Sequence, residues 1–171
     1  MGGCSSLANK NPDTKKLVRF QQAASAGFSA LSKNDSTFQV ITRMIAGIGV
    51  DIISVSRMES VFERRGDRLA LRLLTAEEYA VFKRRKRPVH YLATRFAAKE
   101  AAAKALGTGI GAVSFQDIAV LNLSSGAPVL LFSGRAQHLQ QVRHITKTHI
   151  SLSDEEAYAQ AFVILETTQP C

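Results

Sequence analysis

The sequence predicts an α+β protein whose strands pair mainly in antiparallel fashion. A β-branched apolar run at residues 45–53 comes first, and helical segments then follow as far as residue 106. Beyond residue 112 the chain holds strand-like apolar runs separated by turn residues, with one further helical segment between them. The α+β class typically shows such an order, here one strand, then helices, a hairpin, a helix and a second hairpin.

The composition is that of a folded globular domain with a basic excess. The chain has 171 residues, 46% of them hydrophobic, and its 22 Lys and Arg against 14 Asp and Glu give a net charge of +8. This length favours one domain with or without an extension, and it excludes large α/β barrels, which need roughly 200 residues or more. The positive charge indicates an acidic partner, which can be nucleic acid, anionic lipid, a phosphorylated small molecule or an acidic protein.

The first 43 residues differ from the rest. They are rich in Ser, show no hydrophobic period, and their 6 basic against 2 acidic residues leave +4. We expect residues 1–43 to form a poorly ordered extension, which is a leader, a transit segment or the result of a mis-set start, and residues 44–171 to form the domain. The first six residues also match the short and frequent pattern for N-myristoylation.

The cysteines and the apolar runs indicate the compartment. Cys4 and Cys171 lie at opposite ends of the chain, which fits neither a disulfide framework nor a zinc site. No apolar run approaches the ~20 residues of a membrane span, and the N-terminus lacks the apolar core of a secretory signal. We therefore expect a cytoplasmic protein in a reducing compartment, with no membrane span.

The domain begins with a strand and continues with helices. Residues 45–53 predict a buried strand, in which Gly47 and Gly49 indicate close approach by another backbone. Two capping boxes follow, each a Ser or Thr three residues before a Glu: Ser56 with Glu59, and Thr75 with Glu78. Each box predicts the start of a helix, and Gly66 ends the first of them.

The longest predicted helix spans residues 89–106. It contains seven alanines, so its backbone can approach a neighbour closely, and Gly107 is its expected C-cap. A glycine-rich loop at 107–111 comes next. The remaining elements are a hairpin, a short helix and a second hairpin, at residues 113–123 with 128–132, 134–142, and 149–152 with 158–165.

One acidic residue and one helix face could carry chemistry. Asp51 stands inside the apolar first strand, where a carboxylate is costly unless it is paired, hydrogen-bonded or bound to a metal. Glu100 and Lys104 lie four residues apart on one face of the long helix. Asp51 and Glu100 together could hold one Mg²⁺, which prefers one or two carboxylates with water and phosphate oxygens, and Lys104 would lie near the same phosphates. Lys99 points about 100° away on the helix and could serve another phosphate or only solvent.

Each of these signals also has a purely structural interpretation. Asp51 could pair with a buried arginine, and Glu100 with Lys104 could be an exposed pair worth about 0.3–0.5 kcal/mol. The loop 107–111 follows a helix and is by default a cap; a phosphate-binding loop precedes one, so we exclude a P-loop NTPase. The basic excess over residues 57–95 is either a solvated helix surface or a docking surface for an acidic macromolecule.

Three stretches of the chain carry a family signature. The first is Gly-Ile-Gly-Val-Asp-Ile at 47–52, followed by Arg57; the second and most specific is 92–101 with 104–109; the third is Ser-Leu-Ser at 151–153 with Tyr158 and Ala159. Together they resemble the bacterial holo-[acyl-carrier-protein] synthases, the short branch of the 4'-phosphopantetheinyl transferases. The resemblance covers nearly the whole domain, and it implies the fold of that family and a homotrimer with active sites between subunits.

The resemblance also implies an activity. Such enzymes use Mg²⁺ to transfer 4'-phosphopantetheine from coenzyme A, the co-substrate, to a serine of acyl carrier protein, and they release adenosine 3',5'-bisphosphate. Asp51 and Glu100 become metal ligands, Glu100 and Lys104 catalytic residues. Coenzyme contacts are expected at Lys99, Gly107, Thr108, Gly109 and Gly111, and carrier docking at Arg57 and Arg64. The proton acceptor stays open between a metal-ordered water and Glu100.

One position departs from the family pattern, and two other functions stay open. The family has His after Ser-Leu-Ser, where this chain has Asp154, and an acid near coenzyme phosphates would weaken their binding unless it turns toward solvent. The first alternative is a homologue that binds carrier protein without catalysis. The second is a small basic nucleic-acid-binding module. No nucleic-acid reading motif and no Trp is present, so we expect no nucleic-acid partner.

Overall fold

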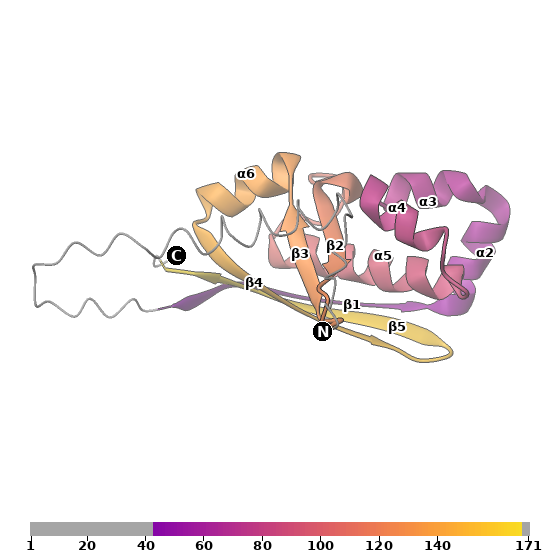
Figure 1. The fold of residues 1–171 in the computed structure, drawn as a ribbon. Helices are drawn as coiled ribbons and strands as arrows, with labels where there is room; N and C mark the ends of the chain where they lie inside the picture. Colours follow the sequence, from indigo (N-terminus) through magenta and orange to yellow (C-terminus); the bar gives the residue numbers. More distant parts are fainter. Residues whose placement is uncertain (1–42, 169–171) are drawn as a thin grey trace, which may run out of the picture. The chain divides into compact units, whose positions relative to one another are not determined.

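The computed structural model describes residues 43–168, so the predicted extension 1–43 lies outside the described residues except for its last one. The elements follow in the predicted order of one strand, helices, a hairpin, a helix and a second hairpin, which confirms the α+β class (Figure 1). They are β1 (Met44–Ser54), α2 (Val55–Arg65), α3 (Asp67–Leu73), α4 (Ala76–Phe82), α5 (Pro88–Ala105), a 3₁₀ turn (Phe115–Asp117), β2 (Ile118–Asn122), β3 (Pro128–Phe132), α6 (Gly134–Val142), β4 (Ile145–Asp154) and β5 (Tyr158–Thr167).

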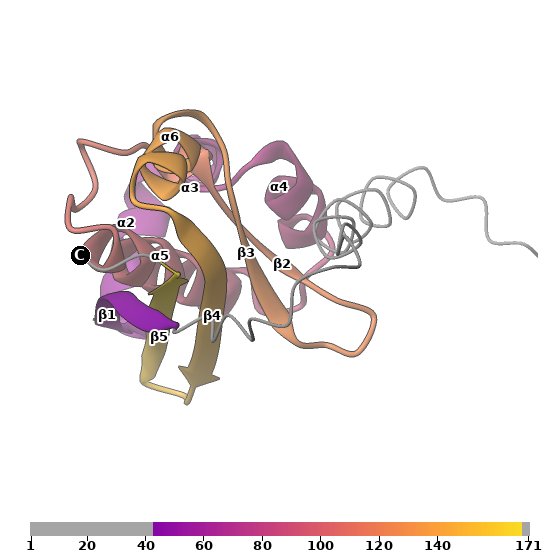
Figure 2. The same cartoon turned by 90° about the vertical axis from the view of Figure 1, so that its left-hand side faces the viewer.

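Two antiparallel sheets organise the domain. The three longest strands pair in the order β1-β5-β4, and β2 pairs with β3 in a separate hairpin. The helices lie on one side of the three-stranded sheet, and α5 runs along it (Figures 1 and 2). None of the helices between residues 43 and 168 has the length and apolarity that a membrane crossing requires.

β1 and α5 meet backbone to backbone. A Cβ added to Gly47 would lie 2.0 Å from the Ala105 carbonyl oxygen, and one added to Gly49 would lie 1.9 Å from that of Ala101. No side chain fits into such a gap, so the close approach that the two glycines predicted is confirmed. The small alanine side chains of α5 permit the same approach from the helix side.

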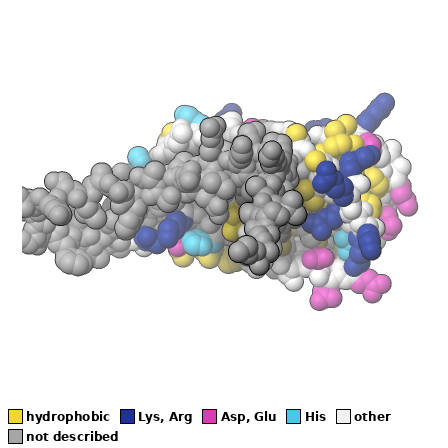
Figure 3. All heavy atoms as spheres, viewed as in Figure 1, with side chains coloured by type: hydrophobic (Ala, Val, Ile, Leu, Met, Phe, Trp, Pro, Cys, Tyr) yellow, Lys and Arg dark blue, Asp and Glu magenta, His cyan; other side chains and the backbone are white. Residues whose placement is uncertain are grey.

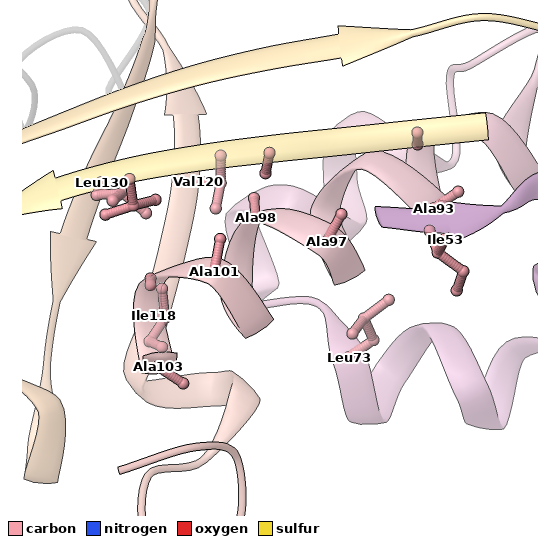
Figure 4. Close-up of a cluster of buried hydrophobic side chains, with 14 of the residues drawn as sticks. Ile53, Leu73, Ala93, Ala97, Ala98, Ala101, Ala103, Ile118, Val120 and Leu130 are labelled. Atoms are coloured by element: carbon pink, nitrogen blue, oxygen red, sulfur yellow. The ribbon is translucent and has the colours of Figure 1, made fainter. Parts of the chain in front are cut away.

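The core is built around the alanines of α5. Those at 93, 97, 98, 101, 102 and 103 are fully buried, and Figure 4 shows several of them between β5 on one side and α3 on the other. Larger apolar side chains close the remaining space, among them Ile53, Leu73, Ile118, Val120 and Leu130. Because α5 is enclosed on most sides, it has no simple division into an apolar and a polar face.

The prediction that the first strand is buried is wrong for one of its two faces. Ile48, Val50 and Ile52 point away from α5 and are 55%, 48% and 60% exposed. The strand register places Phe162 and Tyr158 of β5 on the same side. We call this surface of Ile48, Val50, Ile52, Tyr158 and Phe162 the open sheet face. Because its side chains are apolar, the sequence of β1 lacks the alternation of apolar and polar residues that would have predicted a half-buried strand.

Several element boundaries differ from the sequence prediction. The capping box at Ser56 is wrong: Ser54 is the N-cap of α2, and its hydroxyl accepts a hydrogen bond from the Arg57 amide at 3.0 Å. The Val55 amide donates to the Ala157 carbonyl, so strand pairing runs to the end of β1 and the helix starts there. The box of Thr75 and Glu78 and the end at Gly66 are confirmed.

The remaining differences concern short elements. The sequence did not predict α3, and the strand predicted from residue 113 begins only at Ile118, because a 3₁₀ turn capped by Ser114 precedes it. The strand predicted at 149–152 is longer and forms β4. The bounds of α5, β3, α6 and β5 agree with prediction to within two residues.

Candidate functional site

An ion pair between β1 and α5 forms the centre of the candidate site. Successive residues of a strand point to opposite faces, so Asp51 lies on the side of Gly47 and Gly49, toward α5. Lys104 Nζ is 2.7 Å from Asp51 Oδ1 and donates a second hydrogen bond to the Val50 carbonyl at 3.0 Å. The Lys104 side chain is 49% exposed and that of Asp51 16%, so a ligand can reach the pair. The alternative partner for Asp51, a buried arginine, is wrong.

Glu100 lies one helical turn before Lys104 and completes the cluster. Burial raises the pKa of the Glu100 carboxyl, the nearby Asp51 carboxylate raises it further, and Lys104 opposes both. This coupling requires the carboxyl groups of Asp51 and Glu100 to be within electrostatic reach of each other. Three residues that sequence reasoning assigned to one site, Asp51, Glu100 and Lys104, therefore lie together in space.

The cluster has the donor set of a magnesium site. Within residues 43–168, no group of three or more His, Cys, Asp and Glu side chains could hold a metal ion. Mg²⁺ does not need such a group, because it keeps several waters and binds through one or two carboxylates together with substrate phosphates. Asp51 and Glu100 supply two carboxylates that repel each other, and a cation relieves that repulsion. The residues present thus fit this ion.

Lys99 has the opposite surroundings, and the prediction that it contacts a coenzyme phosphate is wrong. Its side chain is fully buried, with Nζ 2.6 Å from Glu78 Oε2. The same Nζ donates to the carbonyl oxygens of Leu73 and Phe115 at 2.7 and 3.0 Å. Burial lowers the pKa of Lys99 and the Glu78 carboxylate opposes this change. An ammonium group has three protons, so none is left for a phosphate.

The glycine loop at 107–111 closes the end of α5. The Gly107 amide donates to the Lys104 carbonyl, and those of Thr108 and Gly109 donate to the Ala103 carbonyl. Gly107, Gly109 and Gly111 have φ angles of 71°, 67° and 117°, which side chains rarely adopt. The default interpretation as a cap is therefore confirmed, and contact of the four predicted residues of this loop with coenzyme A stays a prediction.

A basic groove lies at the other end of α5. It has a volume of about 690 Å³ and lies between the connection from α4 to α5, the first turns of α5, the β2–β3 hairpin and the end of β4. Its positively charged side chains are Arg84, Arg85, Lys86, Arg87 and Arg95. Figure 3 shows Lys and Arg side chains gathered at the end of the molecule that holds α2, α3 and α4. The exposed Asp154 also lines the groove, so the residue that departs from the family pattern lies among these cations.

Arg95 is the buried cation of this groove, and sequence reasoning gave it no role. Its guanidinium lies 4.4 Å from the centre of the Tyr91 ring and donates to Asn122 Oδ1 at 2.8 Å. Among the described residues its buried Nε has no hydrogen-bond partner, although the side chain is only 4% exposed. A buried donor without a partner is costly, which favours an anion in the groove. The basic excess over residues 57–95 was the available signal, and it was interpreted as either a solvated helix surface or a docking surface for an acidic macromolecule.

The two predicted docking arginines share one face of α2. Arg57 and Arg64 are seven residues apart, which is about two helical turns, and both are exposed. Neither side chain has a hydrogen-bonded or ion-paired partner among residues 43–168. Their charges are therefore available to an acidic surface, which is what the docking prediction requires, and the role itself stays a prediction.

Comparison with protein families matches residues 47–163 to the 4'-phosphopantetheinyl transferase superfamily. The chain is 53% identical over 124 residues to holo-[acyl-carrier-protein] synthase of Pseudoalteromonas atlantica, which covers 72% of this chain and 98% of that protein. It is 50% identical over 132 residues to the enzyme of the same name from Shewanella pealeana, covering 72% and 100%.

Solved structures give the same result. The crystal structure of holo-[acyl-carrier-protein] synthase from Neisseria meningitidis matches with a TM-score of 0.68 and 43% identity, over 71% of this chain and 98% of that one. The Bacillus anthracis synthase, solved in complex with CoA (3',5'-ADP), matches with a TM-score of 0.62 and 42% identity, over 72% and 98%. The matched segment holds Asp51, Glu100, Lys104 and the basic groove.

Proposed function

The chain belongs to the 4'-phosphopantetheinyl transferase superfamily, and from this premise we propose that it transfers 4'-phosphopantetheine from coenzyme A to a serine of acyl carrier protein. The other product is adenosine 3',5'-bisphosphate, and the reaction serves fatty acid biosynthesis. The observation that carries the proposal is the meeting of Asp51, Glu100 and Lys104 between β1 and α5. The chain is a transferase, as are relatives with half or more of their residues identical.

Asp51 and Glu100 are the proposed ligands of Mg²⁺. The ion, when bound, supplies positive charge that offsets the charge developing on phosphate oxygens during the transfer. Two carboxyl groups that raise the energy of each other's charged form are suited to share one divalent cation. Lys104 neutralises Asp51 in the metal-free protein, and its exposed ammonium can then turn toward a phosphate.

Lys104 and Glu100 act on the reacting groups. The oxygen of the carrier serine bonds to the phosphorus that bears phosphopantetheine, while the bond from that phosphorus to the bisphosphate oxygen breaks. Lys104 offsets the charge that appears on the departing bisphosphate. The serine proton goes to the Glu100 carboxylate or to a metal-ordered water, the two acceptors that the sequence left open.

The basic groove is the proposed site for the outer phosphates of coenzyme A. Its four exposed cations and the buried Arg95 offer both charge and an unused donor to an anion. Asp154 is exposed at the end of β4, so it can turn toward solvent and leave the groove positive. The alternative, a carrier-binding homologue without catalysis, requires that Asp154 prevents coenzyme binding.

The open sheet face supports assembly into a homotrimer. Its apolar side chains are contiguous across β1 and β5, and such patches on soluble proteins mark interaction sites. In one chain the groove lies at the first turns of α5 and the Asp51 cluster at its last turns, so the two lie at opposite ends of this helix. In a trimer, a neighbouring copy can place its own groove beside this cluster. Light scattering of the purified chain should give three times the monomer mass, and Phe162→Asp should reduce that mass and the transfer rate together.

Carrier docking is proposed at Arg57 and Arg64. Both are exposed on one face of α2 and are free to meet the acidic surface of a carrier protein. Attraction of this kind raises the rate of encounter and weakens with added salt. The cytoplasm is the proposed compartment, in which coenzyme A and carrier protein meet.

One assay tests the function. Apo carrier protein is incubated with coenzyme A and the chain, with and without Mg²⁺, and mass spectrometry should find one added phosphopantetheine only when the metal is present. Asp51→Asn and Glu100→Gln should abolish the transfer while the thermal unfolding midpoint stays near that of the wild type. Unmodified carrier with every divalent cation would contradict catalysis, and near wild-type turnover by either variant would contradict the metal assignment.

The same samples separate the alternatives. A homologue that only binds carrier should form a complex with it and leave its mass unchanged. A nucleic-acid-binding module should bind duplex or single strands with a steep dependence on salt concentration and should ignore coenzyme A.

A further inference from the structure

Arg143 connects three elements at one end of the domain. It is the C-cap of α6, which lies at the same end of the molecule as the start of β1 (Figure 1). Its Nη2 donates to the Ala46 carbonyl at 2.6 Å and its Nη1 to the Ala105 carbonyl at 3.3 Å. One side chain from α6 thus bonds the backbone of both β1 and α5.

Both acceptors are places where regular backbone pairing is interrupted. Ala46 lies in a bulge, since the register between β1 and β5 shifts between Ile45 and Gly47. Ala105 is the last residue of α5, and helix-end carbonyls have no partner within the helix. The amides that follow the helix bond the carbonyls of Ala102, Ala103 and Lys104. Arg143 takes the carbonyl of Ala105, where a positive charge also complements the helix dipole.

The contact that Arg143 bridges is the one that sets the candidate site. A Cβ on Gly47 would collide with the Ala105 carbonyl, so the two backbones touch with no side chain between them. The carbonyl oxygens of Ala105 and Ala101 occupy the space that side chains at Gly47 and Gly49 would fill, so the position of α5 on β1 depends on how these helix carbonyls are held. Asp51 lies four residues after Gly47 on the strand, and Glu100 lies five residues before Ala105 on the helix. Any slide of α5 therefore changes the separation of these two carboxyl groups directly.

We propose that Arg143 is a positioning residue that fixes α5 against β1 and so sets the spacing of the Asp51 and Glu100 carboxylates for Mg²⁺. The proposal deepens the proposed function and rests on it for the role of the metal. Its structural part, the fixing of α5, is independent of any reaction. Arg143 bonds neither carboxylate, so it acts on the metal through the spacing of the two backbones. Loss of a direct hydrogen-bond partner of a metal ligand weakens metal binding about 10–100-fold, and for this less direct contact we expect the lower end of that range.

The test compares three variants of the full chain. Arg143→Ala removes both hydrogen bonds, Arg143→Lys keeps the charge but has only one nitrogen to share between the two carbonyls, and Arg135→Ala removes an exposed arginine of the same helix as a control. Binding of Mn²⁺, a paramagnetic substitute for Mg²⁺, is measured by electron paramagnetic resonance without substrates, so turnover plays no part in that readout. Hydrogen exchange of the 104–109 amides is measured in metal-free protein.

We expect Arg143→Ala to raise the Mn²⁺ dissociation constant about tenfold or more and to speed exchange of the 104–109 amides, with Arg143→Lys between it and the wild type. The Mg²⁺ concentration at half-maximal transfer should rise with the Mn²⁺ dissociation constant, and the KM for coenzyme A at saturating Mg²⁺ should change less than twofold.

Faster exchange with an unchanged Mn²⁺ dissociation constant would overturn the positioning role and leave a structural one. Unchanged exchange would overturn the proposal altogether. Failure of the proposed function would appear instead as a wild-type chain that neither binds the metal nor modifies carrier.

Discussion

Two lysine–carboxylate pairs on α5 have nearly the same length and opposite surroundings. Lys99 Nζ lies 2.6 Å from Glu78, and five residues further along the helix Lys104 Nζ lies 2.7 Å from Asp51. Both side chains of the first pair are excluded from solvent, whereas those of the second are open to it. Distance does not distinguish the two pairs. Burial does, and it decides which pair holds the fold and which can meet a ligand.

The buried pair is tolerated because its polar atoms have partners. Glu78 accepts hydrogen bonds from the amides of Thr75 and Val120 at 2.8 and 2.9 Å, in addition to its bond with Lys99. These contacts join the start of α4 to β2, and those of Lys99 reach the end of α3 and the 3₁₀ turn. A satisfied network of this kind is stable as a whole, and loss of one member leaves an uncompensated charge in the core.

The largest expected effect is on stability and concerns the buried pair. Lys99→Met leaves the Glu78 carboxylate buried without its cation, and we expect the free energy of unfolding to fall by about 3–5 kcal/mol. Denaturant unfolding followed by circular dichroism measures this. The double variant Lys99→Met with Glu78→Gln should recover part of the loss, since no unpaired charge then remains. A loss below about 1 kcal/mol for the single variant would remove the distinction between the two pairs.

The second effect is on activity and concerns the exposed pair. Lys104→Met removes an ion pair that is open to solvent, so the free energy of unfolding should change by less than about 1 kcal/mol. The transfer rate at saturating coenzyme A should fall about 100-fold, which corresponds to about 2.7 kcal/mol of lost transition-state stabilisation. In matched assays, Lys99→Met should therefore lose mainly stability and Lys104→Met mainly transfer rate. Equal rate losses at equal stability would contradict the assignment of Lys104.

A smaller effect is expected at a cation that lies outside both pairs. Arg57→Glu reverses an exposed charge on α2, and we expect the KM for carrier protein to rise about tenfold at low salt and the difference to shrink as salt is added. The KM of this variant for coenzyme A should stay within twofold of the wild-type value. Arg135→Glu changes net charge by the same amount on α6 and serves as the control. A change in the coenzyme A constant alone would contradict carrier docking.

The smallest effect is the pH dependence at Glu100, which follows Lys99 in sequence but belongs to the exposed cluster. The pKa of Glu100 in the folded chain is raised above the ordinary value of 4.5. At a pH between the ordinary and the raised pKa, the folded chain holds a proton that the unfolded chain releases. The stability that Glu100 contributes in metal-free protein therefore falls as pH rises through this window. The free energy of unfolding of the wild type, minus that of Glu100→Gln, should decrease over the same range. A constant difference would show that the carboxyl group is not perturbed.

Local sequence patterns determined much of this fold. The alanine run and Gly107 located α5, Thr75 with Glu78 located the start of α4, and the two glycines of β1 indicated its backbone contact. These features depend on a few neighbouring residues or on the size of one side chain, which the sequence states directly. The family signature likewise named Asp51, Glu100 and Lys104, and the fold brings them together.

Contacts between distant residues were decided only by the tertiary structure. Lys99 and Lys104 have the same side chain in the same helix, and nothing nearby in sequence says that Glu78, 21 residues away, encloses the first of them. The start of α2 depended on pairing with Ala157, and the groove arose from β4 and the hairpin folding against Arg95. The physical reason is that solvent access and charge pairing belong to the packed surface between elements. The sequence specifies which ionisable side chains are present, and only the packing of the elements decides which of them are exposed to solvent.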